Sequence, residues 1–195
     1  GLRILLRNAG VRARTTVEAD GKSMSMILDS ETLFPQNLLD AAAEALKAAK
    51  AKGIRLATAE TVTAGLVSAC LTSVSGASEV FERGYVLYHS SAKATGLGVS
   101  EEVSAKHGAV SAEVTRGLAV GLLSSSDAGA VVAVTGYAGP GGGSAKNPVG
   151  TVFIATAVRD GGVSEQRHVF PGNRDNVRLE AVQAAIKMLR EQLSK

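Results

Sequence analysis

Apolar residues begin to recur at helical spacing after residue 35. Between 36 and 51 they fall three and four positions apart, with Pro35 before the run and Gly53 after it. This pattern predicts an amphipathic helix over 36–51. Further helices are predicted at 65–74, 91–97, 101–107 and 111–123, and from a cap at Asn173 to near the end of the chain.

Short runs of small and β-branched apolar residues separate these helices and predict strands. The strands are expected at 54–59, 84–88, 130–134, 150–158 and 164–170. Helices and strands alternate early, and the last two strands are adjacent. The pattern therefore predicts an α/β fold, a three-layer αβα sandwich with a mostly parallel, mixed sheet.

The amino-terminal stretch lacks sustained periodicity and carries the excess of basic residues. The chain has 195 residues and a formal net charge of +3, and residues 1–23 account for all of that excess. We expect a basic extension at 1–26, either an addition or an artefact of start-site choice, before one domain at 27–195. A basic docking arm is the functional alternative.

The rest of the composition excludes several classes of protein. The single Cys70 and the three histidines show no metal-ligand spacing, and no apolar run approaches the length of a membrane span. No basic stripe with interleaved aromatic residues indicates nucleic-acid binding. We expect a soluble, cytoplasmic protein with no metal site and with neither nucleic acid nor membrane as a partner.

In α/β folds the loops that leave the carboxyl ends of strands build the functional site. The segment 59–65 follows a buried strand and places hydroxyls beside free helix N–H groups, which suits an oxygen nucleophile or an anion. An ordinary helix cap is the alternative. Lys93 follows Tyr88 by five residues and could act as a base if burial lowered its pKa, but most lysines are solvated.

Two further segments favour anion binding. The glycine-rich stretch 135–144 matches neither a Walker motif nor a dinucleotide fingerprint, and a flexible loop is its simpler interpretation. Arg174 and Arg178 lie four residues apart on one predicted helix face and could clamp a phosphate, although solvated arginines are common.

These motifs, taken together and in order, resemble one family. They are Ala59-Glu60-Thr61-Val62-Thr63-Ala64-Gly65, Gly84-Tyr85 with Tyr88 and Lys93, Val134-Thr135-Gly136-Tyr137-Ala138-Gly139-Pro140-Gly141-Gly142-Gly143 with Pro148-Val149-Gly150-Thr151-Val152, and Phe170 with Gly172 and Arg174. The region from 36 to 193 is similar to the carboxy-terminal domain of the CinA competence/damage-inducible family, in its stand-alone form.

The resemblance implies hydrolysis of nicotinamide mononucleotide to nicotinate mononucleotide and ammonia in pyridine-nucleotide salvage, without a metal or redox cofactor. It implies Thr61 as nucleophile, Lys93 as base, Tyr88 and Thr135 as supporting hydroxyls, and an oxyanion held by N–H groups at the helix start. The substrate-binding residues that it suggests are Glu60, Thr63, Gly136, Ala138, Gly139, Arg174 and Arg178.

The chain departs from the family pattern inside these motifs. Thr61 stands in place of the serine nucleophile, Ala64 in place of the first glycine of a pair, and Ser90 where asparagine is common. The β-branch of threonine restricts χ1 and adds a methyl group beside the attack trajectory. A catalytically silent nucleotide-binding or regulatory relative, and a hydrolase of another small amide, therefore remain alternatives. The alanine-rich composition also favours a homo-oligomer.

Overall fold

The computed structural model describes residues 12–17, 24–29 and 32–194, in two compact units, Gly1–Pro35 and Gln36–Lys195. In the first unit, β1 (Arg12–Val17) pairs antiparallel with β2 (Met24–Asp29). The extension predicted at 1–26 thus contains paired strands in its described part. Residues 1–11 and 18–23 of that extension lie outside the described residues.

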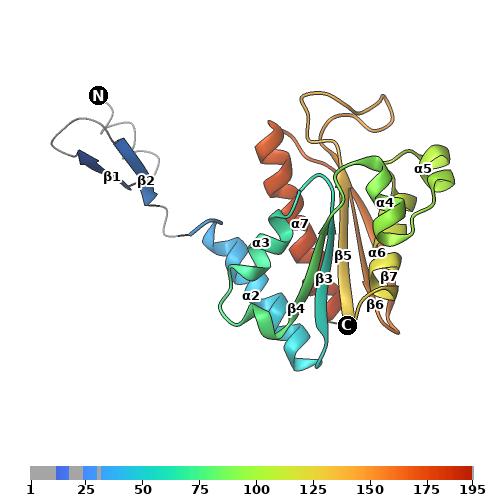
Figure 1. Cartoon of the computed structure of the whole chain (residues 1–195), viewed down its shortest axis with the longest axis horizontal. Helices are drawn as coiled ribbons and strands as arrows, with labels where there is room; N and C mark the ends of the chain where they lie inside the picture. The colour runs from blue at the N-terminus through green and yellow to red at the C-terminus, as the bar shows by residue number, and fades with distance from the viewer. Residues whose placement is uncertain (1–11, 18–23, 30–31, 195) are drawn as a thin grey trace. The chain divides into compact units, whose positions relative to one another are not determined.

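The second unit holds a five-stranded mixed sheet (Figure 1). Its strands are β3 (Arg55–Glu60), β4 (Phe81–Val86), β5 (Ala128–Gly136), β6 (Thr151–Val158) and β7 (Gly162–Val169), in the spatial order β4-β3-β5-β6-β7. β3 runs parallel to both β4 and β5, whereas β6 runs antiparallel to β5 and β7. The carboxyl ends of β3, β4 and β5 therefore meet at one edge of the sheet.

Helices cover both faces of this sheet, which confirms the three-layer prediction (Figure 1). One face carries α2 (Gln36–Ala51), α3 (Leu66–Thr72) and α7 (Arg174–Leu193). The other face carries α4 (Ser90–Leu97), α5 (Glu101–His107) and α6 (Ala112–Ser124), and a 3₁₀ turn, η1 (Ala77–Glu79), precedes β4.

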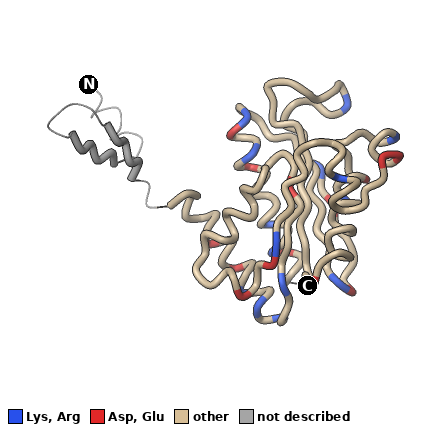
Figure 2. Tube along the Cα trace, in the orientation of Figure 1, with Lys and Arg blue, Asp and Glu red and all other residues tan. Residues whose placement is uncertain are grey.

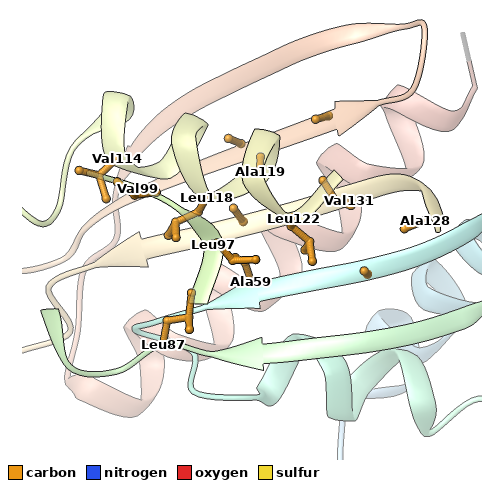
Figure 3. Packing of buried hydrophobic residues seen from close by; sticks show 14 residues of the cluster. Ala59, Leu87, Leu97, Val99, Val114, Leu118, Ala119, Leu122, Ala128 and Val131 are labelled. Atoms are coloured by element: carbon orange, nitrogen blue, oxygen red, sulfur yellow. The ribbon is translucent and has the colours of Figure 1, made fainter. Parts of the chain in front are cut away.

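Small aliphatic side chains fill the space between the sheet and α6. Val131 of β5 packs against Leu118 and Leu122 of α6, in a cluster that Leu87 and Leu97 extend toward α4 (Figure 3). β5 is buried along nearly its whole length because helices cover both of its faces. This explains why its central residues, 130–134, are a continuous run of alanine and valine without alternation.

The predicted element boundaries agree with the structure to different degrees. The helix at 36–51 is confirmed residue for residue, and Asn173 caps α7 in a capping box with Asn176. The strand predicted at 84–88 lies instead at Phe81–Val86. β4 is an edge strand whose residues are exposed or half-buried, and Glu82 and Arg83 interrupt the apolar pattern near its start.

Charges of both signs are interspersed over the second unit, and the described residues show no continuous stripe of one sign (Figure 2). Within the part of the chain that the structure describes, no helix combines the length and the apolar character needed to cross a bilayer.

Candidate active site

A cavity of about 290 Å³ opens at the carboxyl ends of β3, β4 and β5. It lies where the loops after these strands meet the start of α7, the position at which parallel sheets usually bind ligands. Its lining residues are Thr61, Val62, Tyr88, Ser90, Lys93, Ala109, Val110, Gly136, Tyr137, Ala138, Gly139, Gly141 and Arg174.

Glu60 organises the loop that carries Thr61. Its carboxylate is fully buried and accepts hydrogen bonds from the backbone N–H groups of Gly65 (2.9 Å), Val67 (3.0 Å) and Ser68 (2.8 Å). The hydroxyls of Ser68 (2.6 Å) and Thr58 (3.3 Å) donate to it as well. With five donors around its oxygens and no place in the cavity wall, Glu60 shapes the turn into α3 and does not face a substrate.

This arrangement corrects the expected oxyanion site. The free N–H groups at the start of α3 were expected to stabilise an oxyanion, but Glu60 accepts from Gly65, Val67 and Ser68. By contrast, the N–H groups of Val62, Ala138 and Gly139 have no acceptor among the described residues, and these three residues line the cavity. These three groups are therefore available as donors to an anion in the cavity.

Arg178 braces the same loop from α7. Its Nε donates to the carbonyl of Val62 at 3.2 Å, and its Nη2 donates to that of Thr63 at 3.1 Å. Arg178 and Thr63 do not line the cavity, and the Thr63 hydroxyl is buried without a hydrogen-bond partner among the described residues. The predicted phosphate clamp of two arginines is therefore not formed at this cavity, because only Arg174 lines it.

Ala64 adopts a backbone conformation that favours glycine. Its φ is 50°, in the left-handed region, and Gly65 follows with φ of 95°. A residue with a Cβ pays about 1–2 kcal/mol in this region. The turn between Thr61 and α3 is therefore strained at the position where the family pattern has glycine.

Replacing Ala64 with glycine should raise the free energy of unfolding by about 0.5–1 kcal/mol, because relief of the left-handed strain exceeds the extra chain entropy of glycine. Urea unfolding followed by circular dichroism measures the change. Ala69→Gly, within helix α3, is the matched control and should destabilise by about 1 kcal/mol. A destabilised A64G protein would show that the loop compensates the strain elsewhere.

Lys93 is buried inside α4 and reaches the cavity. Its side chain is 4% exposed, and Nζ donates to the carbonyl of Ala109 at 2.8 Å. Among the described residues no carboxylate forms an ion pair with it. Burial disfavours the charged amine and lowers the pKa of Lys93 below the ordinary lysine value. Burial thus raises the neutral fraction of this amine, and the neutral amine is the form that a general base requires.

Thr61 faces the same cavity but is turned toward the strand. Its N–H donates to the carbonyl of Val134 at 3.0 Å, and its Oγ1 donates to the same carbonyl at 3.2 Å. Thr61 and Lys93 therefore each donate to a backbone carbonyl and form no hydrogen bond with each other. Free enzymes often hold catalytic groups in such loose arrangements, which tighten when substrate binds.

Thr135 lies behind the cavity wall. It is fully buried, and its hydroxyl lies 2.8 Å from that of Thr115 on α6. Because the Thr115 hydroxyl donates to the carbonyl of Ser111 at 2.6 Å, Thr135 is the donor of the pair. Thr135 thus ties β5 to the first turns of α6.

Arg174 spans the mouth of the cavity. Its Nη1 donates to the carbonyl of Gly139 at 2.9 Å, and its Nη2 donates to the Tyr88 hydroxyl at 2.7 Å. A guanidinium carries five N–H groups, so donors remain for an anion. The pair of Tyr88 and Arg174 joins two segments 86 residues apart and gives this side of the cavity a positive charge.

The structure brings together seven of the eleven predicted site residues. Thr61, Lys93, Tyr88, Gly136, Ala138, Gly139 and Arg174 line the cavity, whereas Glu60, Thr63, Thr135 and Arg178 lie behind it. Six further lining residues are not among the predicted site residues. Four of them, Val62, Ser90, Tyr137 and Gly141, lie within the motifs. The other two are Ala109 and Val110, which lie outside every motif. They contribute backbone and apolar surface, for which the sequence carries no chemical signal.

The described residues contain no group of three or more histidine, cysteine or acidic side chains arranged to hold a metal ion. The chemistry available at the cavity comes from hydroxyls, one buried amine, one guanidinium and backbone N–H groups. This set suits attack on a carbonyl carbon by an oxygen nucleophile.

Comparison with known proteins gives consistent matches. The family model described as "CinA C-terminal domain" matches residues 39–193. The nicotinamide-nucleotide amidohydrolase PncC of Escherichia coli K12 is 44% identical over 146 residues, which cover 75% of this chain and 88% of that protein. A CinA-like protein of Mycolicibacterium gilvum is 42% identical over 175 residues, covering 88% of this chain and 40% of the relative.

Solved structures agree with the sequence matches. The competence/damage inducible protein CihA from Agrobacterium tumefaciens superimposes with a TM-score of 0.81 at 39% identity, covering 84% of this chain and 99% of that one. A CinA superfamily protein from Escherichia coli gives a TM-score of 0.75 at 28% identity, covering 86% and 94% of the two chains.

Proposed function

This chain belongs to the CinA C-terminal domain family, and from that premise we propose that it hydrolyses the carboxamide of nicotinamide mononucleotide to nicotinate mononucleotide and ammonia. The observation that carries the proposal is the buried, uncompensated Lys93 in the same cavity as the Thr61 hydroxyl. A general base needs its neutral form, and burial without an ion pair favours that form over the charged one.

In the first half of the reaction, the Thr61 Oγ1 turns from the Val134 carbonyl toward the substrate and forms a bond to the carboxamide carbon. Neutral Lys93 accepts the hydroxyl proton. The N–H groups of Val62, Ala138 and Gly139 are available to the carbonyl oxygen as it gains negative charge. Lys93 then returns the proton to the amide nitrogen, the C–N bond breaks and ammonia leaves.

In the second half, water attacks the ester formed on Thr61. Lys93 takes a proton from the water and passes it to the Thr61 oxygen as the C–O bond breaks, which restores the hydroxyl and releases nicotinate mononucleotide. Glu60, Arg178 and Thr135 act as positioning residues, because their contacts hold the Thr61 loop and the start of α6.

Arg174 is the candidate for the 5′-phosphate of the nucleotide. Its guanidinium lies in the cavity wall and keeps unused N–H donors after its bonds to Gly139 and Tyr88. A phosphate is a suitable acceptor for such a planar group of donors.

One observation favours a second candidate function. The Thr61 hydroxyl donates to Val134 and not to Lys93, and its methyl group restricts χ1. In a relative that binds the nucleotide without hydrolysing it, the Thr61 hydroxyl would stay on the Val134 carbonyl when the nucleotide is bound. Ammonia release therefore distinguishes the two candidate functions.

The purified full chain should release ammonia from nicotinamide mononucleotide, measured with a coupled glutamate dehydrogenase assay. Because Lys93 must be neutral to accept a proton, kcat/KM should rise with pH through the lowered pKa of Lys93. Nicotinamide riboside, which lacks the phosphate, is the matched substrate for the role of Arg174. Nucleotide binding by calorimetry without any ammonia release would support the silent relative instead.

A further inference from the structure

β7 is an edge strand of the five-stranded sheet, and within the described part of the chain it pairs only with β6. Along the described residues, no strand occupies its other side. β7 is eight residues long, and the side chains of Glu165, Gln166, Arg167 and Val169 are exposed. A long unpaired edge of this kind offers free main-chain N–H and C=O groups to another strand.

The register with β6 decides which of these groups face outward. The Phe170 N–H donates to the Gly150 carbonyl at 2.9 Å, in continuation of the pairing between Val169 and Thr151. In an antiparallel ladder, alternate residues direct both of their main-chain groups to the same neighbour. The even-numbered residues of β7 therefore bond to β6, and Val163, Glu165, Arg167 and Val169 point their main-chain groups outward.

The two charged side chains of this outward set lie on one face of the sheet. Ser164 bonds to Gln192 of α7, whereas Val163 packs on the cluster around α6, so the odd-numbered side chains share the α6 face. Across the ladder within the chain, Glu165 lies opposite Ala155 and Arg167 opposite Phe153. Neither charge has a cross-strand partner of opposite sign on β6.

A second copy of β7 can place an opposite charge across from both Glu165 and Arg167 when the two strands pair in one particular register. Two copies can pair antiparallel so that Glu165 of each lies opposite Arg167 of the other, with Val163 opposite Val169 and the two-fold axis at Gln166. A shift by two residues in one direction sets Glu165 against Glu165, and a shift in the other direction sets Arg167 against Arg167. Opposite charges across a ladder stabilise it and like charges destabilise it, so only the central register is favourable.

We propose that β7 is a dimerisation strand, which joins two copies of this chain edge to edge through antiparallel pairing centred on Gln166. The arrangement is isologous, as a two-fold dimer requires. It also gives the half-exposed Val169 an apolar neighbour, Val163 of the partner subunit. Arg167 already donates to Asn147 and Lys146 through Nε and Nη2, and its Nη1 is left for the partner's Glu165.

Sedimentation equilibrium of the full chain tests the proposal. The parent protein should associate to twice the chain mass, and Glu165→Arg or Arg167→Glu should each raise the dimer Kd roughly 10- to 100-fold, because two attractive pairs become repulsive. Equimolar mixing of E165R and R167E should restore association, since each variant then meets its opposite charge. The double variant E165R/R167E should also dimerise.

Glu102→Arg, an exposed charge reversal on α5, is the matched control and should leave the Kd unchanged. Hydrogen exchange gives a second readout, in which the amides of 163, 165, 167 and 169 become protected as protein concentration rises. A parent that stays monomeric up to about 1 mM would overturn the proposal. A dimer that neither single variant weakens would overturn it as well, because its interface would lie elsewhere and the charges of β7 would serve only to guard the edge.

Discussion

Replacing Lys93 with methionine is expected to lower kcat for ammonia release from nicotinamide mononucleotide roughly 10²–10⁴-fold, the usual contribution of a general base. Methionine fills the buried position with a side chain of similar length but has no amine. Because Lys93 removes a proton during the reaction and Arg174 is unaffected, nucleotide binding measured by calorimetry should change little. The loss should therefore fall on kcat and not on KM.

Lys106→Met, an exposed lysine on α5, is the control for removal of a positive charge. The K93M substitution also leaves the Ala109 carbonyl without its donor, which costs about 1–3 kcal/mol of stability. Circular dichroism should show that the variant is folded at the assay temperature. A folded K93M protein that retains the parent's kcat would remove Lys93 from the mechanism.

Substitutions of Thr61 test the nucleophile in both directions. Thr61→Ala should reduce kcat at least roughly 10³-fold, since no hydroxyl remains to form the acyl-enzyme. Thr61→Ser should raise kcat by up to roughly 100-fold, because loss of the methyl group frees χ1 and lets the oxygen leave the Val134 carbonyl. Steady-state kinetics over a range of nucleotide concentrations measures both effects.

Thr95→Ser on the exposed side of α4 is the matched control for the loss of one methyl group. An unchanged kcat in T61S would show that the methyl group does not limit the reaction. If the parent is inactive and T61S releases ammonia, threonine at this position is what silences the site. Activity in T61A would assign the attacking oxygen to another group.

The sequence predicts the layers of the fold more completely than it predicts the contacts within the site. The apolar periodicity of α2 and the buried run of β5 report local burial directly, and both elements are found where they are predicted. Edge strand β4 is shifted because Glu82 and Arg83 interrupt the apolar pattern near its start. The predicted strand ends near Glu60, Tyr88 and Thr135 nevertheless lie on the side of the sheet where the cavity opens.

The sequence by itself determined the residue types at the site and the order in which they occur. Motifs that follow strands bring Thr61, Tyr88 and Gly139 to one edge of a parallel sheet whatever their side-chain contacts are. The sequence could not determine which of the polar side chains in these motifs face the cavity. Within the same motifs, Glu60 and Thr61 are neighbours, yet one caps a helix and the other lines the cavity.

Only the tertiary structure decided these roles, because they depend on contacts between residues far apart in the chain. Arg178 bonds to the Thr61 loop across more than a hundred residues and does not line the cavity with Arg174. Lys93 has a lowered pKa because the fold buries it against Ala109, and no local pattern distinguishes it from a solvated lysine. Burial and hydrogen-bond partners are properties of the folded molecule. They determine the pKa of a side chain and which of its donors and acceptors are available, whereas the sequence gives only the residue type.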